Sequence, residues 1–220
     1  LESNVIQKAS QGVLEINNTG LSILEISHRS SEFTHIIEEA KTLTKELLRI
    51  SDDYEILFLQ GGASLQFYMA ALNFSRARGT AAYIDTGTWS AKAIKEAKLF
   101  GDTITIASSK DKNYNYIPKN YIIPKDANYF HCTSNNTVFG TQIKDFPKTP
   151  INLVCDMSSD IFSRNIDINK FDLIYAGAQK NLGPAGTTLV IIKKEILGKT
   201  ERNIPTMLDY RTHINKNSMF

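Results

Sequence analysis

Two side chains in this sequence are well placed for chemistry, an aspartate and a lysine that each follow an apolar run. Asp156 comes directly after Leu153-Val154-Cys155, and Lys180 comes shortly after Leu173-Ile174-Tyr175-Ala176. Each alone is usually structural, because an aspartate at a strand end often caps a turn and a loop lysine is usually solvated. As a pair they offer an amine that can bond to an aldehyde and a carboxylate that can hold a proton on a nitrogen base.

Two more strand ends carry features that complement this pair. The turn 60–64, Gln-Gly-Gly-Ala-Ser, opens a helix, so its backbone N–H groups can hold an anion, although it lacks the ending of a phosphate-binding P-loop and any G-x-G-x-x-G. Trp89, the only tryptophan, follows another apolar run; such a residue is usually core, but here it can offer a flat face to a ligand. Lysine, carboxylate, flat aromatic and anion-binding turn are the parts that pyridoxal 5'-phosphate requires.

An alternation of strands and helices positions these residues. Apolar residues at three- and four-residue steps predict an amphipathic helix over 31–50, with Ser30 and Ser31 as candidate caps. Helices are also expected over 65–72 and 91–100. Strands are expected over 55–59, 81–84, 103–107, 129–132, 151–155, 171–176 and 187–192. Several of the strands are apolar throughout, which predicts a three-layer α/β/α domain with a mostly parallel central sheet.

Two features of the sequence carry weaker signals. Residues 108–128 mix lysines with tyrosines, which suggests a solvated excursion more than a nucleic-acid surface, because no RNP-like motif is present. Cys132 and Cys155 have the spacing neither of a zinc site nor of a redox motif, so no metal is expected. They could pair, but both lie at the ends of apolar runs, and unpaired cysteines in a reducing cytoplasm are the simpler interpretation.

Composition excludes several classes of function. The chain has 220 residues, 42% of them hydrophobic, and 25 Lys and Arg against 23 Asp and Glu leave a formal charge of +2. This balance indicates neither nucleic acid nor an anionic membrane as a partner. No apolar stretch approaches the roughly 18 residues of a membrane span, and the first residues do not read as a signal peptide. A soluble, cytoplasmic protein is expected, whose function depends on a site.

Several motifs resemble those of one enzyme family. ILEISHRSSEF, YIDTGTWSAKAIKEAK, CDMSSDIFSRNIDI and above all YAGAQKNLGPAG are similar to signatures of the phosphoserine aminotransferases, which are class V, fold-type-I pyridoxal-phosphate enzymes. The resemblance runs along the whole chain. It implies the large domain of that fold over residues 1–220, pyridoxal 5'-phosphate as cofactor and a homodimer.

The resemblance also assigns roles to single residues. It makes Lys180 the lysine that bonds to the cofactor, Asp156 the partner of its pyridine nitrogen and Trp89 the residue that stacks on its ring. Ala63, Ser64 and Gln179 would hold the phosphate, and Thr137 would hydrogen-bond at the cofactor. His28 and Arg29 match a pair that binds the anionic substrate across the dimer interface, a role that suits a guanidinium because it grips carboxylate or phosphate with two hydrogen bonds.

The implied reaction moves an amino group between glutamate and 3-phosphohydroxypyruvate, which makes phosphoserine for serine synthesis. 4-Phosphohydroxy-L-threonine, a precursor of pyridoxine, is the implied second substrate. Two alternatives stay open: another class V activity such as cysteine desulfuration, which needs a reactive cysteine on a mobile loop, and a non-catalytic domain that only binds the cofactor.

The sequence departs from the family pattern in two respects. Many relatives carry arginine where Ser64 stands, so phosphate binding is expected to depend more on backbone N–H groups. The family's short N-terminal glycine-proline segment and its smaller C-terminal α/β domain are expected to be missing. With them would go an Asn-Thr pair that contacts the phosphate from the neighbouring subunit.

Overall fold

A seven-stranded sheet forms the centre of the molecule. A computed structural model describes residues 1–76 and 79–220. The strand order is β1-β9-β8-β7-β4-β2-β3, and within this sheet only β9 runs antiparallel to its neighbours. The strands are β1 (Tyr54–Leu59), β2 (Thr80–Asp85), β3 (Asp102–Ser108), β4 (Phe130–Thr133), β7 (Leu153–Asp156), β8 (Leu173–Gly177) and β9 (Thr188–Lys193). The parallel strands therefore end at one common edge.

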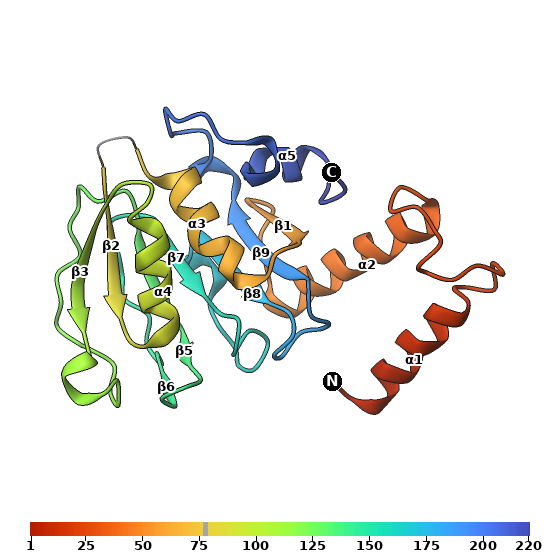
Figure 1. Ribbon diagram of the computed structural model, residues 1–220, viewed down its shortest axis with the longest axis horizontal. Helices are drawn as coiled ribbons and strands as arrows, with labels where there is room; N and C mark the ends of the chain where they lie inside the picture. Colours follow the sequence, from red (N-terminus) through yellow and green to blue (C-terminus); the bar gives the residue numbers. More distant parts are fainter. Residues whose placement is uncertain (77–78) are drawn as a thin grey trace.

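Helices cover one face of the sheet. α3 (Gly62–Phe74) and α4 (Thr88–Ala97) lie across this face (Figure 1), and they pack on Tyr83, Tyr175 and Val190. α5 (Tyr210–Asn215) adds the buried Tyr210 to the same cluster. Each of these side chains is almost completely removed from water, so this layer contributes a large part of the hydrophobic stabilisation.

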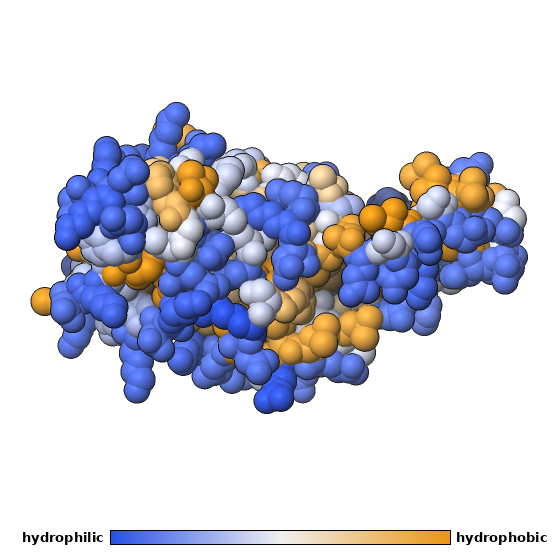
Figure 2. Space-filling view, turned by 90° about the horizontal axis from the view of Figure 1, so that it is seen from below, coloured by the Kyte–Doolittle hydropathy of each residue, from blue (hydrophilic) through white to orange (hydrophobic). Residues whose placement is uncertain are grey.

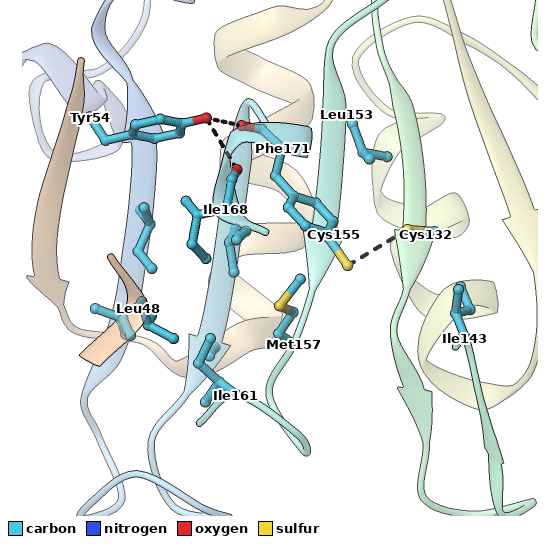
Figure 3. Packing of buried hydrophobic residues seen from close by; sticks show 14 of the residues in the cluster. Leu48, Tyr54, Cys132, Ile143, Leu153, Cys155, Met157, Ile161, Ile168 and Phe171 are labelled. Atoms are coloured by element: carbon cyan, nitrogen blue, oxygen red, sulfur yellow. Dashed lines mark hydrogen bonds between the residues drawn. The ribbon is translucent and has the colours of Figure 1, made fainter. Parts of the chain in front are cut away.

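The opposite face is covered mainly by irregular segments together with the end of α2 (Ser31–Leu48). Leu48, Ile161 and Phe171 pack there against the other side of the strands (Figure 3). The Tyr54 hydroxyl donates toward the carbonyl oxygens of Ile168 and Phe171, at 3.1 and 2.7 Å, so a buried polar group is satisfied within this layer. Short 3-10 turns complete it and the other connections: Lys110–Lys112, Ile168–Lys170, Lys194–Ile196 and Thr206–Leu208.

Local sequence explains where α2 and α3 begin and end. Ser30 caps α2 by accepting a hydrogen bond from the Phe33 N–H, as expected, and Arg49 ends the helix in the left-handed region. Gly61 precedes α3 with φ +92°, and a Cβ there would lie 2.4 Å from Leu65 Cδ2. A side chain at Gly61 would therefore be strained and would collide, so the turn between β1 and α3 requires glycine.

The first helix lies apart from this core. α1 (Ser3–Leu14) buries none of its residues, and with the first part of α2 it forms an arm that extends from the sheet (Figure 1). Figure 2 shows apolar atoms over this arm. The large apolar side chains exposed on it are Leu1, Val5, Ile6, Val13, Leu14, Leu21 and Leu24, and Leu43 and Leu47 are exposed further along α2. No helix in the described part of the chain is long and apolar enough to span a membrane.

The expected elements are largely confirmed. All seven expected strands and the three expected helices are present, with ends that differ by a few residues. The sequence reading missed α1, α5 and a small hairpin of β5 (Asn135–Asn136) and β6 (Thr141–Gln142). Cys132 and Cys155 are unpaired and buried, with their Sγ atoms 3.6 Å apart on adjacent strands (Figure 3).

Candidate active site

The ends of five strands meet at a small cavity on the helix-covered side of the sheet. Its volume is about 120 Å³. The residues that line it come from the turn into α3, the start of α4 and the ends of β4, β7 and β8: Gly62, Ala63, Ser64, Trp89, Thr133, Asn135, Asp156, Ser158, Ser159, Gln179 and Lys180. Six of the predicted site residues are in this list, so the fold gathers residues that are far apart in the sequence.

Lys180 lies in the loop between β8 and β9. Its Nζ donates to Thr137 Oγ1 at 3.3 Å and lies 5.2 Å from the centre of the Trp89 ring. Thr137 belongs to the connection of the β5–β6 hairpin. The amine, the aromatic face and the hydroxyl therefore approach one another from three elements.

Asp156 ends β7 as a buried carboxylate. Its Oδ1 accepts two hydrogen bonds from Ser158, from the backbone N–H at 2.9 Å and from the hydroxyl at 2.6 Å. Burial raises the pKa of Asp156, whereas the two Ser158 hydrogen bonds and the charge of Lys180 act to lower it. A buried carboxylate with this surrounding is suited to hold a proton on a base that enters the cavity.

Trp89 is held in place by the turn that begins α4. Ser90 Oγ donates to the Asp85 carboxylate at 3.1 Å and accepts from the backbone N–H groups of Thr86 and Gly87, both at 2.9 Å. Gly87 has φ +150°, and a Cβ at this position would lie 1.8 Å from Asn136 Nδ2. The Trp89 turn is therefore in direct contact with the hairpin that carries Thr137.

The turn into α3 presents backbone N–H groups to the cavity. Gly62, Ala63 and Ser64 occupy the first turn, where the N–H groups have no intrahelical acceptor. A Cβ at Gly177 would lie 3.5 Å from the Ala63 nitrogen and 3.0 Å from Gln179 Oε1. Glycine at that position lets the end of β8 approach this turn closely.

A polar cluster fixes the β5–β6 hairpin beside the cavity. Asp160, which is buried, accepts hydrogen bonds from Ser134 Oγ, from Gln142 Nε2 at 3.0 Å and from Arg164 at 3.2 Å. Asn135 and Ser159 exchange two further hydrogen bonds, at 2.9 and 3.0 Å. These contacts join the hairpin to the segment that follows Asp156.

His28 and Arg29 are not part of the cavity in this chain. Both are exposed in the turn before α2, and His28 instead lines a separate hollow with Phe33, Gln60 and Phe220. The sequence-based interpretation assigned this pair to the site of a neighbouring subunit. That interpretation stays a prediction, since the structure holds one chain.

The cavity has the features that pyridoxal 5'-phosphate requires. Thr133 Oγ1, which is buried at the cavity, has no hydrogen-bond partner in the described part of the chain. Both hydrogen bonds given to the Asp156 carboxylate end on Oδ1. An amine that can bond to an aldehyde, a flat aromatic face, a carboxylate and several free N–H groups thus surround one space. These residues fit pyridoxal 5'-phosphate.

The sequence reading missed four residues that line this cavity. Thr133, Asn135, Ser158 and Ser159 lie on it but were not singled out. Ser158 had a recognisable signal, because a serine two residues after an aspartate commonly hydrogen-bonds back to it in a turn. The other three become visible only when β4 and β7 are paired in register.

The fold is that of the large domain of pyridoxal-phosphate-dependent aminotransferases. A model of the family "Aminotransferase class-V" matches residues 1–207. The chain therefore belongs to the class V aminotransferases.

The similar proteins within this family carry one name. The phosphoserine aminotransferase of Flavobacterium psychrophilum is 63% identical over 221 residues, and that of Parabacteroides distasonis is 56% identical over 220. The match takes in 100% of this chain and 62% and 61% of theirs. The crystal structure of phosphoserine aminotransferase from Bacillus circulans is also similar, with a TM-score of 0.95, 44% identity and coverage of 100% of this chain and 62% of that one.

A further similar structure has the cofactor bound. It is the pyridoxal-phosphate-bound phosphoserine aminotransferase of Trichomonas vaginalis, with a TM-score of 0.93 and 33% identity. The match covers 100% of this chain and 63% of that one. The chain thus spans a little over three fifths of the length of these relatives.

Proposed function

We propose that residues 1–220 form the cofactor-binding large domain of a phosphoserine aminotransferase. The reaction is the transfer of an amino group from glutamate to 3-phosphohydroxypyruvate, which gives phosphoserine for serine synthesis and releases 2-oxoglutarate. The relatives described above carry this name, and identity of up to 63% across the chain supports the transfer of their activity. 4-Phosphohydroxy-L-threonine is proposed as a second substrate.

The cofactor is pyridoxal 5'-phosphate, which supplies an aldehyde for covalent attachment and a ring that takes up electrons from the substrate. Lys180 would hold the cofactor through Nζ, and its free amine would move the proton of the substrate Cα. Asp156 would keep the ring nitrogen protonated, and Trp89 would offer its face to the ring. Ala63, Ser64 and Gln179 would bind the phosphate, and Thr137 would hydrogen-bond beside Lys180.

One observation carries the proposal: Lys180 Nζ, the Trp89 face and the Asp156 carboxylate share a single cavity. A loop lysine that is merely solvated has no reason to line a cavity together with a tryptophan ring and a buried acid at the carboxyl edge of a parallel sheet. In open α/β folds ligands bind at that edge. The contacts therefore favour a catalytic lysine over a merely structural one.

The proposed enzyme is a homodimer in which His28 and Arg29 bind the anionic substrate in the partner subunit's site. Their exposure in the turn before α2 supports this role, because both side chains are open to a second copy. The exposed apolar side chains of the arm and an apolar hollow of about 710 Å³ between α2 and residues 162–165 offer surface for such contact (Figure 2).

The alternative of cysteine desulfuration has no support from the two cysteines. Cys132 and Cys155 are both completely buried in β4 and β7, and burial raises the pKa of the Cys155 thiol well above its usual range. A nucleophilic cysteine needs an accessible thiolate.

The same unpaired thiols favour a cytoplasmic location for the protein.

A half-reaction assay tests the proposal. The protein is loaded with pyridoxal 5'-phosphate and mixed separately with L-glutamate, O-phospho-L-serine, 4-phosphohydroxy-L-threonine or L-cysteine. We expect loss of the visible absorbance of the bound cofactor with the first three, together with release of the matching keto acid. Sulfide release from L-cysteine would instead indicate a desulfurase, and cofactor binding without any reaction would indicate a binding domain.

A further inference from the structure

Ser158 makes direct contact with the carboxylate of Asp156. Its backbone N–H and its hydroxyl both donate to Oδ1, at 2.9 and 2.6 Å. Both residues are nearly buried, with 5% of Asp156 and 6% of Ser158 exposed. Water therefore competes little with these two hydrogen bonds.

A third hydrogen bond determines the direction of the hydroxyl. The backbone N–H of Gly177, at the end of β8, donates to Ser158 Oγ at 3.0 Å. A backbone nitrogen only donates, so Oγ accepts this bond and its single proton is free for Asp156. Asp156 Oδ1 consequently receives two donors and carries no proton itself, which leaves Oδ2 as the oxygen for a donor that enters the cavity.

The same contacts oppose the effect of burial on Asp156. Burial raises the pKa of this carboxyl and the charge of the buried Asp160 adds to the increase, whereas the bonds from Ser158 lower it. The ionised form is the one that holds a proton on a ring nitrogen by electrostatic attraction. Ser158 thus favours both the orientation and the charge state that the proposed chemistry needs.

We propose that Ser158 is a positioning residue: it fixes Asp156 by Oδ1, directs Oδ2 toward the pyridine nitrogen and ties this arrangement to the strand that leads to Lys180. The inference rests on the proposed function. Ser158 touches the carboxylate of Asp156, and its hydroxyl donates a hydrogen bond that an apolar side chain could not donate.

A double-mutant cycle tests the inference. The dissociation constant for pyridoxal 5'-phosphate is measured by equilibrium dialysis for the wild type, Ser158→Ala, Asp156→Asn and the double variant. We expect Ser158→Ala to weaken binding about tenfold or more in the wild-type background, the value of one charge-assisted hydrogen bond. In the Asp156→Asn background the same change should have an effect of less than about twofold, since the charged acceptor is gone.

The pH dependence separates positioning from a general structural role. Loss of the Ser158 hydroxyl removes a contact that lowers the pKa of Asp156, so this carboxyl should become protonated at a higher pH in the variant. The cofactor affinity of Ser158→Ala should therefore decline at a higher pH than that of the wild type when the pH is lowered from 8 to 5. Ser158→Cys keeps the volume with a weak donor and should show the same shift if the alanine variant does not fold.

Thr149→Ala is the control. Its hydroxyl donates to the Ile151 carbonyl at 2.9 Å and does not touch the cavity, so affinity and pH profile should stay as in the wild type. Equal losses from Ser158→Ala in both backgrounds, or no loss in either, would overturn the inference while wild-type binding still supports the proposed function. A wild type that does not bind the cofactor at all would overturn both.

Discussion

At the scale of single residues, the site depends on side chains that differ in how strongly they are held. Asp156 is buried and fixed by Ser158, whereas Lys180 is exposed and has one hydrogen bond, to Thr137. This difference matches the proposed roles. A carboxylate that stabilises a charge works best in a fixed position, and an amine that alternates between bonding and proton transfer must move.

The first prediction concerns Lys180. Lys180→Ala should abolish the covalent attachment of the cofactor, while the free energy of unfolding should change by less than about 0.5 kcal/mol because the side chain is exposed. Borohydride reduction followed by peptide mapping measures the attachment, and urea denaturation measures the stability. A reduced label on Lys193 or Lys194 in the wild type would refute the assignment.

At the scale of the elements, most of the secondary structure could be predicted from the sequence. The strands are short apolar runs and α2 has a clear helical period, so both were recognised. Only part of α3 was expected, since it is apolar on most sides and lacks a period. The β5–β6 hairpin could not be predicted: each strand has two residues, and their position depends on contacts of Asp160 and Arg164 from elsewhere in the chain.

The site was predictable to a similar extent. Lys180, Asp156 and Trp89 could be identified because each follows an apolar strand, and strand ends meet at one edge. Their contacts with Thr137 and Ser158 could not be derived from spacing, since they depend on how loops from different strands pack. The sheet face opposite α3 and α4 also differs from expectation. Helices were expected to cover it, but irregular segments provide most of its covering.

The second prediction concerns the contact between α4 and the hairpin. Gly87→Ala should destabilise the protein by about 1 to 3 kcal/mol and weaken cofactor binding, because the new Cβ meets Asn136 at a φ that disfavours side chains. Gly12→Ala in α1 is the control, since nothing lies within 4 Å of its Cβ position. Urea denaturation and equilibrium dialysis compare the two variants, and equal behaviour would contradict this account of the turn.

The third prediction concerns His131, which is buried in β4. Its Nε2 lies 2.7 Å from the Tyr175 hydroxyl, its Nδ1 has no partner among the described residues, and burial lowers its pKa to about 3. The folded state thus keeps His131 neutral, whereas the unfolded chain binds a proton below about pH 6.5. The protonation of His131 in the unfolded chain therefore has no effect on the free energy of unfolding above that pH. It lowers this free energy increasingly as the pH falls toward 3.

His131→Phe should remove this dependence. Relative to the variant, the wild type should lose about 1.4 kcal/mol of unfolding free energy for each pH unit between 6 and 4. The variant should be less stable at pH 7.5, because Tyr175 loses its hydrogen-bond partner. Urea denaturation of the cofactor-free proteins across this range measures both effects, and parallel pH curves would contradict the assignment. Comparison with the variant cancels the opposite contribution of Asp156, whose pKa burial raises.

At the scale of the whole molecule, the exposed pair His28 and Arg29 lies outside the cavity of its own chain. Its proposed role therefore depends on formation of the dimer. The burial of the apolar side chains on the arm would depend on it as well. If the pair serves the partner's site, neither subunit is complete alone. This dependence can be measured without knowing the contacts between subunits.

The fourth prediction uses two inactive variants. Arg29→Ala should keep its covalently bound cofactor but lose productive use of glutamate and phosphoserine, since the guanidinium binds substrate anions. Mixed with Lys180→Ala through unfolding and refolding, it should form dimers that hold one complete site, and activity should recover to roughly a quarter of the wild-type value. If the mixture recovers no activity, Arg29 binds the substrate in the site of its own subunit.

The pairing of β1 with β9 has a consequence for synthesis of the protein. Leu59 faces Thr188 in the sheet, and 129 residues (188 − 59) separate them. At roughly 5 to 20 residues per second, a ribosome needs about 6 to 26 s to make that interval. During this time the earliest strand of the sheet, β1, lacks the strand β9 with which it pairs. Because the loop that carries Lys180 lies between β8 and β9, this loop and the delayed strand are made together, so the nascent chain completes the edge of its sheet and gains the proposed reactive amine in one late step.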